Sequence, residues 1–447
     1  MALSNTVMDA SSSTRQRLNE DEDRISYLPD NILHYILSFL STKFAVRTSV
    51  LSTRWKQVWF GISNLVFYAF GPMDKLIFMN FVDNVLLHHD ATFIDKFSVS
   101  SKLVLDDTRV NGWISTILDR NVGELVLNTF VEHPLMLPCT LFTSKVLQRM
   151  KLHVDSNLKL PVSFCISSLK VLHLDFITFS CEEEIHQVSL SFPVLEKLVL
   201  IDCIWNIEVV NIYAPALENL MINDASYAAD NIYDFEIKIY AESLITLDLV
   251  SKFAYKFSLH NLSSLSKASV DFHSEHGIED RVSKLIEGIG NVKDLMLSSE
   301  AVEILFVANL TVELLAFPNL KSLRVHIQGG YVYGEMLTEL FSYLPNVESL
   351  LFTKEVDIIF FEGNGCWTLE AIPQSFLSNL KSVELRSFDG NENDLGLVEF
   401  LLKNAIALQK VTIRGSSALS ANPKKQFEVT KQLLMLPRDS TCVIDFS

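Results

Sequence analysis

The residues that could do chemistry are scattered along this sequence and form no catalytic pattern. The six cysteines stand singly, and Cys181 with His186 would need two further ligands to hold zinc. Gly329, Gly330 and Gly334 lack the GxxxxGK[ST] spacing of a phosphate-binding loop. No GxSxG motif is present to activate a serine. The sequence therefore predicts no catalytic residue, no metal site and no cofactor.

The charge of the chain argues against two classes of partner. Its 447 residues carry a formal net charge of -17, and the longest basic run is the pair Lys424 and Lys425. Such an average field repels a polyanion and an anionic bilayer, so we expect neither nucleic acid nor a membrane as a partner. Residues 1–22 read as a polar and acidic tail without the apolar core of a signal peptide, and no run of 18 apolar residues follows. We therefore expect a cytoplasmic or nuclear protein, or one found in both places.

Residues 23–62 predict three short helices with more apolar surface than they can bury among themselves. Pro29 suits the first turn of a helix, and Ser41 and Ser52 are placed to begin the next two. The first helix has an apolar stripe made of Ile32, Leu33, Ile36, Leu37 and Leu40, and the third carries Trp55, Val58 and Trp59. About forty residues cannot enclose this surface, so part of it must face a partner.

A different pattern recurs from residue 94 to residue 413: an apolar residue, two others, an apolar, one other, and an apolar. It occurs thirteen times, first at Ile94 and last at Leu408, with separations of 21 to 33 residues. This is the period of leucine-rich repeats, in which each unit supplies one strand and a return segment. The sequence predicts an α/β solenoid of parallel strands, shaped as an uneven horseshoe with mixed helical and irregular backs.

The end of the chain reads as a cap for this solenoid. The segment 393–405 predicts a helix, and the segment 425–437 predicts another with Phe427, Lys431 and Leu434 in register. A last strand, TCVIDF, is expected to pair with or cover the final repeat, because open repeat arrays need such a cap.

Two parts of the sequence resemble known plant domains. DRIS at 23–26, LPDNILHYILSFL at 28–40 and AVRTSVLSTRWKQVW at 45–59 resemble an F-box. IPQSFLSNLKSVELRSF, DLGLVEFLLKNAIALQKVTI and KQLLMLPRDSTCVIDF resemble the FBD domain. The chain is thus similar to plant F-box/LRR/FBD proteins, with an F-box at 23–62, a leucine-rich-repeat solenoid at 63–370 and an FBD domain at 371–447 that continues and caps it.

The resemblance implies the substrate-recognition subunit of an SCF-type ubiquitin ligase. The F-box would dock on a Skp-type adaptor, which leads to the cullin and RING core, and the repeats would hold the target protein. The chain would itself be non-catalytic, acting by proximity. The candidate adaptor-binding residues are Leu28, Pro29, Ile32, Leu33, Ile36, Leu37, Leu40, Val46, Leu51, Trp55 and Trp59. The alternative for Trp55 and Trp59 is that they form the small core of the F-box itself.

The repeats also predict which side chains face the concave side of the solenoid. In each strand the residue between the last two apolar positions points away from the core, because neighbours alternate between faces. The candidate substrate-binding residues on this row are His173, Val199, Met221, Met296, Arg324 and Leu351. The alternative is that loops or the C-terminal unit cover them.

Two other functions remain open from the sequence. The same repeats could hold a partner without any ligase, as a protein-interaction scaffold. A small-molecule receptor of the hormone-binding kind would be expected to gather several basic side chains in the concave face, but the row offers only Lys151 and Arg324.

Overall fold

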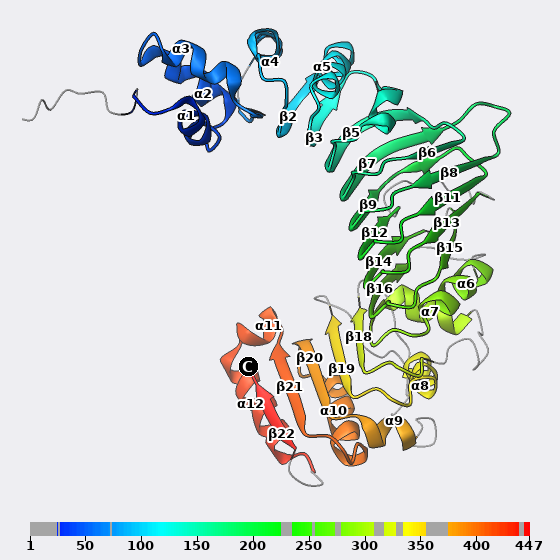
Figure 1. The fold of residues 1–447 in the computed structure, drawn as a ribbon. Coiled ribbons are helices and arrows are strands. Elements are labelled where there is room, and N and C mark those ends of the chain that lie inside the picture. Colours follow the sequence, from blue (N-terminus) through cyan, green and yellow to red (C-terminus); the bar gives the residue numbers. More distant parts are fainter. Residues whose placement is uncertain are drawn as a thin grey trace, which may run out of the picture.

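Three short helices begin the described part of the chain. The computed structural model describes residues 25, 27–71, 74–224, 235–252, 255–272, 279–307, 317–327, 334–354, 374–437 and 442–447 (Figure 1). The helices are α1 (Asp30–Leu37), α2 (Thr42–Arg47) and α3 (Trp55–Val58), with 3-10 turns η1 (Thr48–Val50) and η2 (Trp59–Gly61). Pro29 stands at the N-cap of α1 and Ser41 at that of α2. The three-helix prediction is confirmed.

The rest of the chain is organised around one parallel sheet that lines the inside of a horseshoe (Figure 1). Fifteen of its strands follow one another in chain order, and two short strands, β4 (Leu135–Met136) and β10 (Ile204–Trp205), pair beside β5 and β7. The fifteen are β1 (Asn64–Ala69), β2 (Lys96–Leu105), β3 (Glu124–Val131), β5 (Arg149–Lys159), β7 (Val171–Ser180), β9 (Lys197–Ile201), β12 (Asn219–Asn223), β14 (Thr246–Ser251), β16 (Lys267–Phe272), β17 (Asp294–Ser298), β18 (Ser322–Ile327), β19 (Ser349–Lys354), β20 (Ser382–Phe388), β21 (Lys410–Gly415) and β22 (Val443–Phe446).

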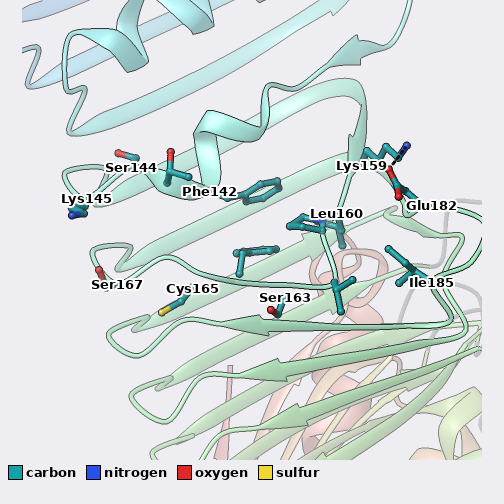
Figure 2. A pocket seen from close by; sticks show the side chains of 14 residues that line it. Phe142, Ser144, Lys145, Lys159, Leu160, Ser163, Cys165, Ser167, Glu182 and Ile185 are labelled. Carbon is teal, nitrogen blue, oxygen red and sulfur yellow. Dashed lines mark ion pairs between the residues drawn. The ribbon is translucent and has the colours of Figure 1, made fainter.

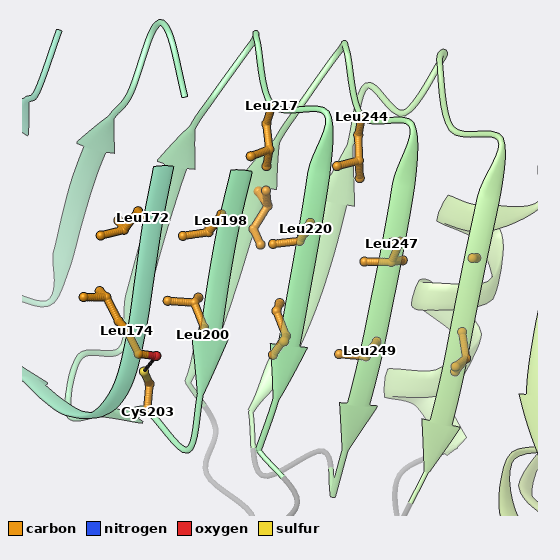
Figure 3. Close-up of a cluster of buried hydrophobic side chains, with 14 of the residues drawn as sticks. Leu172, Leu174, Leu198, Leu200, Cys203, Leu217, Leu220, Leu244, Leu247 and Leu249 are labelled. Carbon is orange, nitrogen blue, oxygen red and sulfur yellow. Dashed lines mark hydrogen bonds between the residues drawn. The ribbon is translucent and has the colours of Figure 1, made fainter. Parts of the chain in front are cut away.

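Stacked leucines hold successive repeats together. Leu198 and Leu200 of β9 lie between Leu172 and Leu174 on one side and Leu220 on the other, and the ladder continues to Leu247 (Figure 3). The thirteen positions that begin the repeat pattern are all at most 5% exposed. No single repeat could bury these side chains, so the stacking of neighbours supplies the core.

The outer side of the horseshoe changes along the chain (Figure 1). Helices α4 (Lys75–His88) and α5 (Asp107–Asp119) cover the first repeats, followed by the 3-10 segment η3 (Cys139–Thr143). The last repeats carry α6 (Glu279–Ile289), α7 (Ser299–Val307), α8 (Gly334–Ser342), α9 (Gln374–Asn379) and α10 (Glu392–Asn404). The predicted α/β solenoid is confirmed.

A second parallel sheet forms the back of the middle repeats, where the sequence analysis expected irregular or helical segments. Its strands are β6 (Ser163–Cys165), β8 (Gln187–Ser191), β11 (Val209–Tyr213), β13 (Glu236–Tyr240) and β15 (Lys256–His260). Three of the five spacings between Leu147 and Leu265 are only 21 or 22 residues, shorter than any other spacing in the array. Extended chain covers more distance per residue than a helix, so a strand closes these short repeats.

The C-terminal end is covered by α11 (Ser417–Ser420), α12 (Pro423–Met435) and β22, which pairs with β21 at the end of the sheet. The expected closing strand is therefore present. The expected helix over 425–437 is present as α12, and the face it buries is that of Val429 and Leu433, whereas Phe427 and Leu434 are exposed. Within the described residues, no helix is long and apolar enough to cross a bilayer.

Candidate functional site: the F-box surface and the concave face

Helix α1 has apolar side chains on two faces. Leu33 and Leu37 are at most 1% exposed and pack into the core. Ile32 and Ile36 are about two-fifths exposed, at 41% and 40%, and Phe39 just beyond the helix is 72% exposed. The spacing i, i+4, i+7 places these three on one side, where they face solvent. An apolar helix face left open in this way marks an interaction surface.

The other predicted adaptor-binding residues also divide into exposed and buried side chains. Pro29, Leu40 and Leu51 are exposed, and Leu28 and Val46 are half-buried. In contrast, Leu33, Leu37, Trp55 and Trp59 lie in the chain's own core, with Trp55 4% and Trp59 8% exposed. Side chains buried to this extent offer no surface to a partner. They support the exposed face, which agrees with the alternative that the sequence left open for both tryptophans.

The structure adds four exposed apolar residues that the sequence analysis did not select: Tyr35, Phe39, Phe44 and Val50. Tyr35 and Phe39 contact each other edge to face, with ring centroids 5.0 Å apart. The signal was present in the sequence, because Ile32, Tyr35, Ile36 and Phe39 follow the helical spacing i, i+3, i+4 and i+7. The stripe predicted from the sequence mixes the two sides: Leu33 and Leu37 become core, whereas Ile32, Ile36 and Leu40 stay exposed.

Two contacts hold the F-box helices in place. Arg54 Nη2 donates to the Leu28 carbonyl at 2.7 Å and to Asp30 Oδ1 at 2.5 Å, which ties the start of α1 to the start of α3. The Arg54 hydrogen bond also lowers the pKa of Asp30. The Val66 amide of β1 donates to Thr42 Oγ1 at 2.7 Å, and Thr42 is fully buried. The exposed face of α1 is therefore carried on a framework attached to the first strand of the solenoid.

The predicted concave row is continuous from strand to strand. His173 pairs in register with Val199, Val199 with Met221, and Met296 with Arg324, which pairs in turn with Leu351. The same row runs from Val66 in β1 to Asp445 in β22. All six candidate substrate-binding residues therefore lie in this row, whereas their role in binding stays a prediction.

Exposure along this row is uneven. Val199 is only 3% exposed, while the other five candidates are half-buried. A partner could therefore touch Met221, Met296 or Leu351 without any rearrangement, but could reach Val199 only at its edge.

Several charges on the concave face are paired with opposite charges, most of them on a neighbouring strand. Glu124 accepts from Lys96 and from Arg149, both at 2.9 Å, and Glu384 accepts from Arg386 at 2.7 Å and from Arg414 at 3.0 Å. Arg324 pairs with Asp294 at 3.1 Å. A surface of alternating, paired charges suits a protein partner better than a polyanion.

One acid on the concave face has two histidine neighbours, a cluster that the sequence analysis did not select. His153 Nδ1 lies 2.6 Å from Asp175 Oδ2, and His173 Nε2 lies 2.8 Å from Oδ1. Burial raises the pKa of Asp175, but the two histidines outweigh it and hold that pKa below its ordinary value. Cross-strand register brings His153 beside Asp175, whereas His173 precedes Asp175 by two residues on the same strand. Among the described residues, no group of three or more His, Cys, Asp or Glu side chains is arranged to hold a metal ion.

Three family models match separate parts of the chain. The F-box domain model matches residues 25–65, and the FBD model matches residues 370–413. A model of the LRR repeats of the FBD-associated F-box protein At5g56370 matches residues 110–256. These ranges fall on α1 to β1, on the middle repeats, and on α9 to β21.

Curated relatives from Arabidopsis thaliana match this chain over nearly their whole length. The FBD-associated F-box protein At4g10400 is 28% identical, over 95% of this chain and 100% of the relative. F-box/LRR-repeat protein 13 is also 28% identical, over 97% of this chain and 98% of the relative.

The fold and the exposed F-box define a modular interaction protein built on a repeat solenoid. With the three matches, the chain is similar to F-box/LRR-repeat/FBD proteins. Proteins of this family are generally non-catalytic adaptors, and the match supports a role in SCF substrate recognition in general terms.

Proposed function

We propose that this chain is the non-catalytic substrate-recognition subunit of an SCF-type ubiquitin ligase. Its F-box would bind a Skp-type adaptor through the exposed face of α1, and its concave face would bind the target protein. The observation that carries the proposal is the exposed stripe Ile32, Tyr35, Ile36 and Phe39 on a helix whose opposite side is fully buried.

The size of this surface fits a docking role. Burial of a large apolar side chain contributes roughly 1.5–3 kcal/mol, while association costs on the order of 4–15 kcal/mol. One stripe of α1 would therefore bind weakly by itself. Exposed Phe44, Val50 and Leu51 from the following elements supply further anchors, and large apolar side chains commonly dominate such interfaces.

The concave row supports the second half of the proposal. It offers partly exposed apolar side chains, Met221, Met296 and Leu351, among neutralised charges, which is the composition of a protein-binding surface. A chain that works in this way acts in the cytoplasm, the nucleus or both, and a fluorescent fusion protein would test that location.

The direct test is binding of the full-length chain to a purified Skp-type adaptor by isothermal titration calorimetry. We expect an Ile36→Ala/Phe39→Ala double variant to bind roughly 10- to 100-fold more weakly, because two anchors are truncated. The matched control is Leu76→Ala/Leu87→Ala, which truncates two leucines of α4 that are 62% and 77% exposed. Equal loss in both double variants, or no binding by the wild type, would refute docking through α1.

Co-purification of a cullin separates this function from a ligase-independent scaffold. The proposal expects a cullin to be recovered with the wild type and lost with the Ile36→Ala/Phe39→Ala variant. Recovery of partners without any cullin would favour the scaffold.

A further inference from the structure

The two edges of the outer five-stranded sheet differ in how they are covered. The β15 edge is covered by α6, which packs so closely that a Cβ on Gly288 would lie 3.6 Å from both Cβ and the carbonyl oxygen of Leu259. The opposite edge is β6, which among the described residues pairs only with β8. Proteins usually cover or block an exposed sheet edge, because its unpaired backbone groups accept further strands. The unpaired β6 edge is therefore a candidate site for a further strand.

The hydrogen-bond pattern shows which backbone groups of β6 point outward. The Ser189 amide donates to the Val162 carbonyl at 2.9 Å, and the Ile166 amide donates to the Ser191 carbonyl at 3.1 Å. In a parallel ladder the N–H and C=O of one residue face the same neighbour, and successive residues alternate. Val162, Phe164 and Ile166 thus face β8, whereas the backbone groups of Ser163 and Cys165 face away from it.

A groove of about 790 Å³ lies along this free edge. One wall is β6 and its flanks, and the other is η3 with the loop that follows it (Figure 2). Val162, Phe164 and Ile185 give it apolar surface, and Leu160 and Phe142 line it as buried side chains. Phe142 and Phe164 stack with ring centroids 4.2 Å apart.

The two ends of the groove differ in charge. Lys145 lies at one end near Ser144 and Ser167, while Lys159 at the other end pairs with Glu182 at 3.3 Å (Figure 2). Lys145 is exposed and has no acidic partner among the described residues. One end therefore offers an uncompensated positive charge in a chain whose formal net charge is -17.

We propose that this groove receives an extended segment of a partner protein, which pairs with β6 as a sixth strand and places an acidic residue beside Lys145. The outward N–H and C=O groups of Ser163 and Cys165 would bond to the segment's backbone, as in β-strand addition. Alternate side chains of the segment would rest on Phe142 and Phe164. A volume of this size could also hold a small ligand, but the edge presents backbone groups at the two-residue repeat of a strand, which favours a peptide. This site is separate from the F-box and does not depend on ligase assembly.

The structure offers a variant that blocks strand addition while leaving the sheet intact. Cys165→Pro removes an outward N–H and fills its place with the proline ring, whereas the ladder to β8 uses the neighbouring residues. Cys165→Ser keeps the N–H and is the matched control. Lys145→Glu tests the charge at an exposed position where folding is not at risk.

The probe is a phage-displayed library of random linear dodecapeptides, panned on the full-length chain. We expect enriched sequences to alternate apolar and polar residues and to carry Asp or Glu. Fluorescence anisotropy of the synthetic peptides should show unchanged binding to Cys165→Ser, at least 10-fold weaker binding to Cys165→Pro, and weaker binding to Lys145→Glu. Circular dichroism and thermal melting check that each variant is folded.

Four outcomes would overturn the proposal. One is that no peptide is enriched, and another is that the enriched peptides bind Cys165→Pro as well as the wild type. A third is that peptides with N-methylated backbones bind equally well, which would mean a pocket for side chains or small ligands. The last is that the Ser163 and Cys165 amides already exchange slowly with solvent in the free chain, which would mean that another segment of the same chain occupies the edge.

Discussion

Asp224 is a buried acid with only partial compensation. It is 7% exposed, and it accepts from Ser251 Oγ at 3.1 Å and from the Lys252 amide at 2.9 Å. Burial, with a smaller effect of the charge of Asp202, raises the pKa of Asp224 to about 6 against the effect of these two bonds. At neutral pH Asp224 is therefore ionised in the folded protein, although its buried environment favours the protonated form.

Replacement of Asp224 by Asn should stabilise the protein, and more so at high pH. Because the folded pKa is raised, Asp224 contributes its full stability below pH 3.8 and loses it as the pH rises through about 6. The cost of ionisation at pH 7 is about 3 kcal/mol, from 1.36 kcal/mol per pKa unit. Thermal unfolding should show a larger gain for Asp224→Asn at pH 7.5 than at pH 4.5. An equal gain at both values, or a loss at pH 7.5, would contradict this account.

The described cysteines should differ sharply in reactivity. Cys203 is buried, its Sγ lies 3.4 Å from the Leu174 carbonyl, and burial raises the pKa of its thiol to about 12 (Figure 3). Cys165 is exposed at the edge of the outer sheet. Because the thiolate is the reactive form, iodoacetamide at pH 8 should modify Cys165 in the native protein and leave Cys203 unmodified. Peptide mass spectrometry measures this, with the urea-unfolded chain as the control in which both react. Modification of native Cys203 would mean that the repeat opens locally.

At the scale of elements, one buried lysine joins the repeats to the FBD segment. Lys354 at the end of β19 is 2% exposed, and its Nζ lies 2.6 Å from Asp389 Oδ2 and 3.2 Å from both oxygens of Asp394. Asp394 also accepts from the Asp389 and Gly390 amides, which fixes the turn before α10. This network crosses from β19 to the turn between β20 and α10, and so positions α10 on the sheet.

Removal of Lys354 should destabilise this region strongly. Lys354→Ala leaves two carboxylates without their cation, and breaking a buried pair costs about 3–5 kcal/mol. Lys410→Ala is the control, because Lys410 pairs with Asp445 on the surface and such pairs contribute at most about 1 kcal/mol. Urea unfolding followed by circular dichroism compares the two. Equal effects of both substitutions would show that the network contributes little.

Features of single strands and helices account for the part of the fold that could be predicted from the sequence. The leucine period revealed the inner strands, and strict alternation gave the concave row, because both patterns are dictated by one strand at a time. The outer strands, such as Glu236–Tyr240, are too short to be distinguished from loops until their neighbours pair with them. Helix α1 is apolar on both sides, so periodicity could not tell which side becomes core. The cluster around Asp175 depends on register between strands.

At the scale of the whole molecule, the chain forms a curved array in which each strand pairs only with its neighbours (Figure 1). The F-box adjoins β1 at one end, and the FBD segment forms the other end up to β22. A target on the concave face would therefore be held at a fixed offset from the adaptor. Stability in such arrays is a sum of repeat and nearest-neighbour contributions, so a local defect need not spread.

The two ends of the chain should consequently lose structure independently. In Lys354→Ala, we expect amide hydrogen exchange to accelerate in peptides covering β19 to β21 and to stay at the wild-type rate in α1 to α3. The reason is that many stacked repeats, from β2 to β18, separate Lys354 in β19 from Trp55 and Trp59. Hydrogen exchange mass spectrometry of both regions measures this, with Lys410→Ala as the control. Equal acceleration at both ends would show that the array unfolds as one cooperative unit, and a mutation in the FBD segment would then also weaken docking through the F-box.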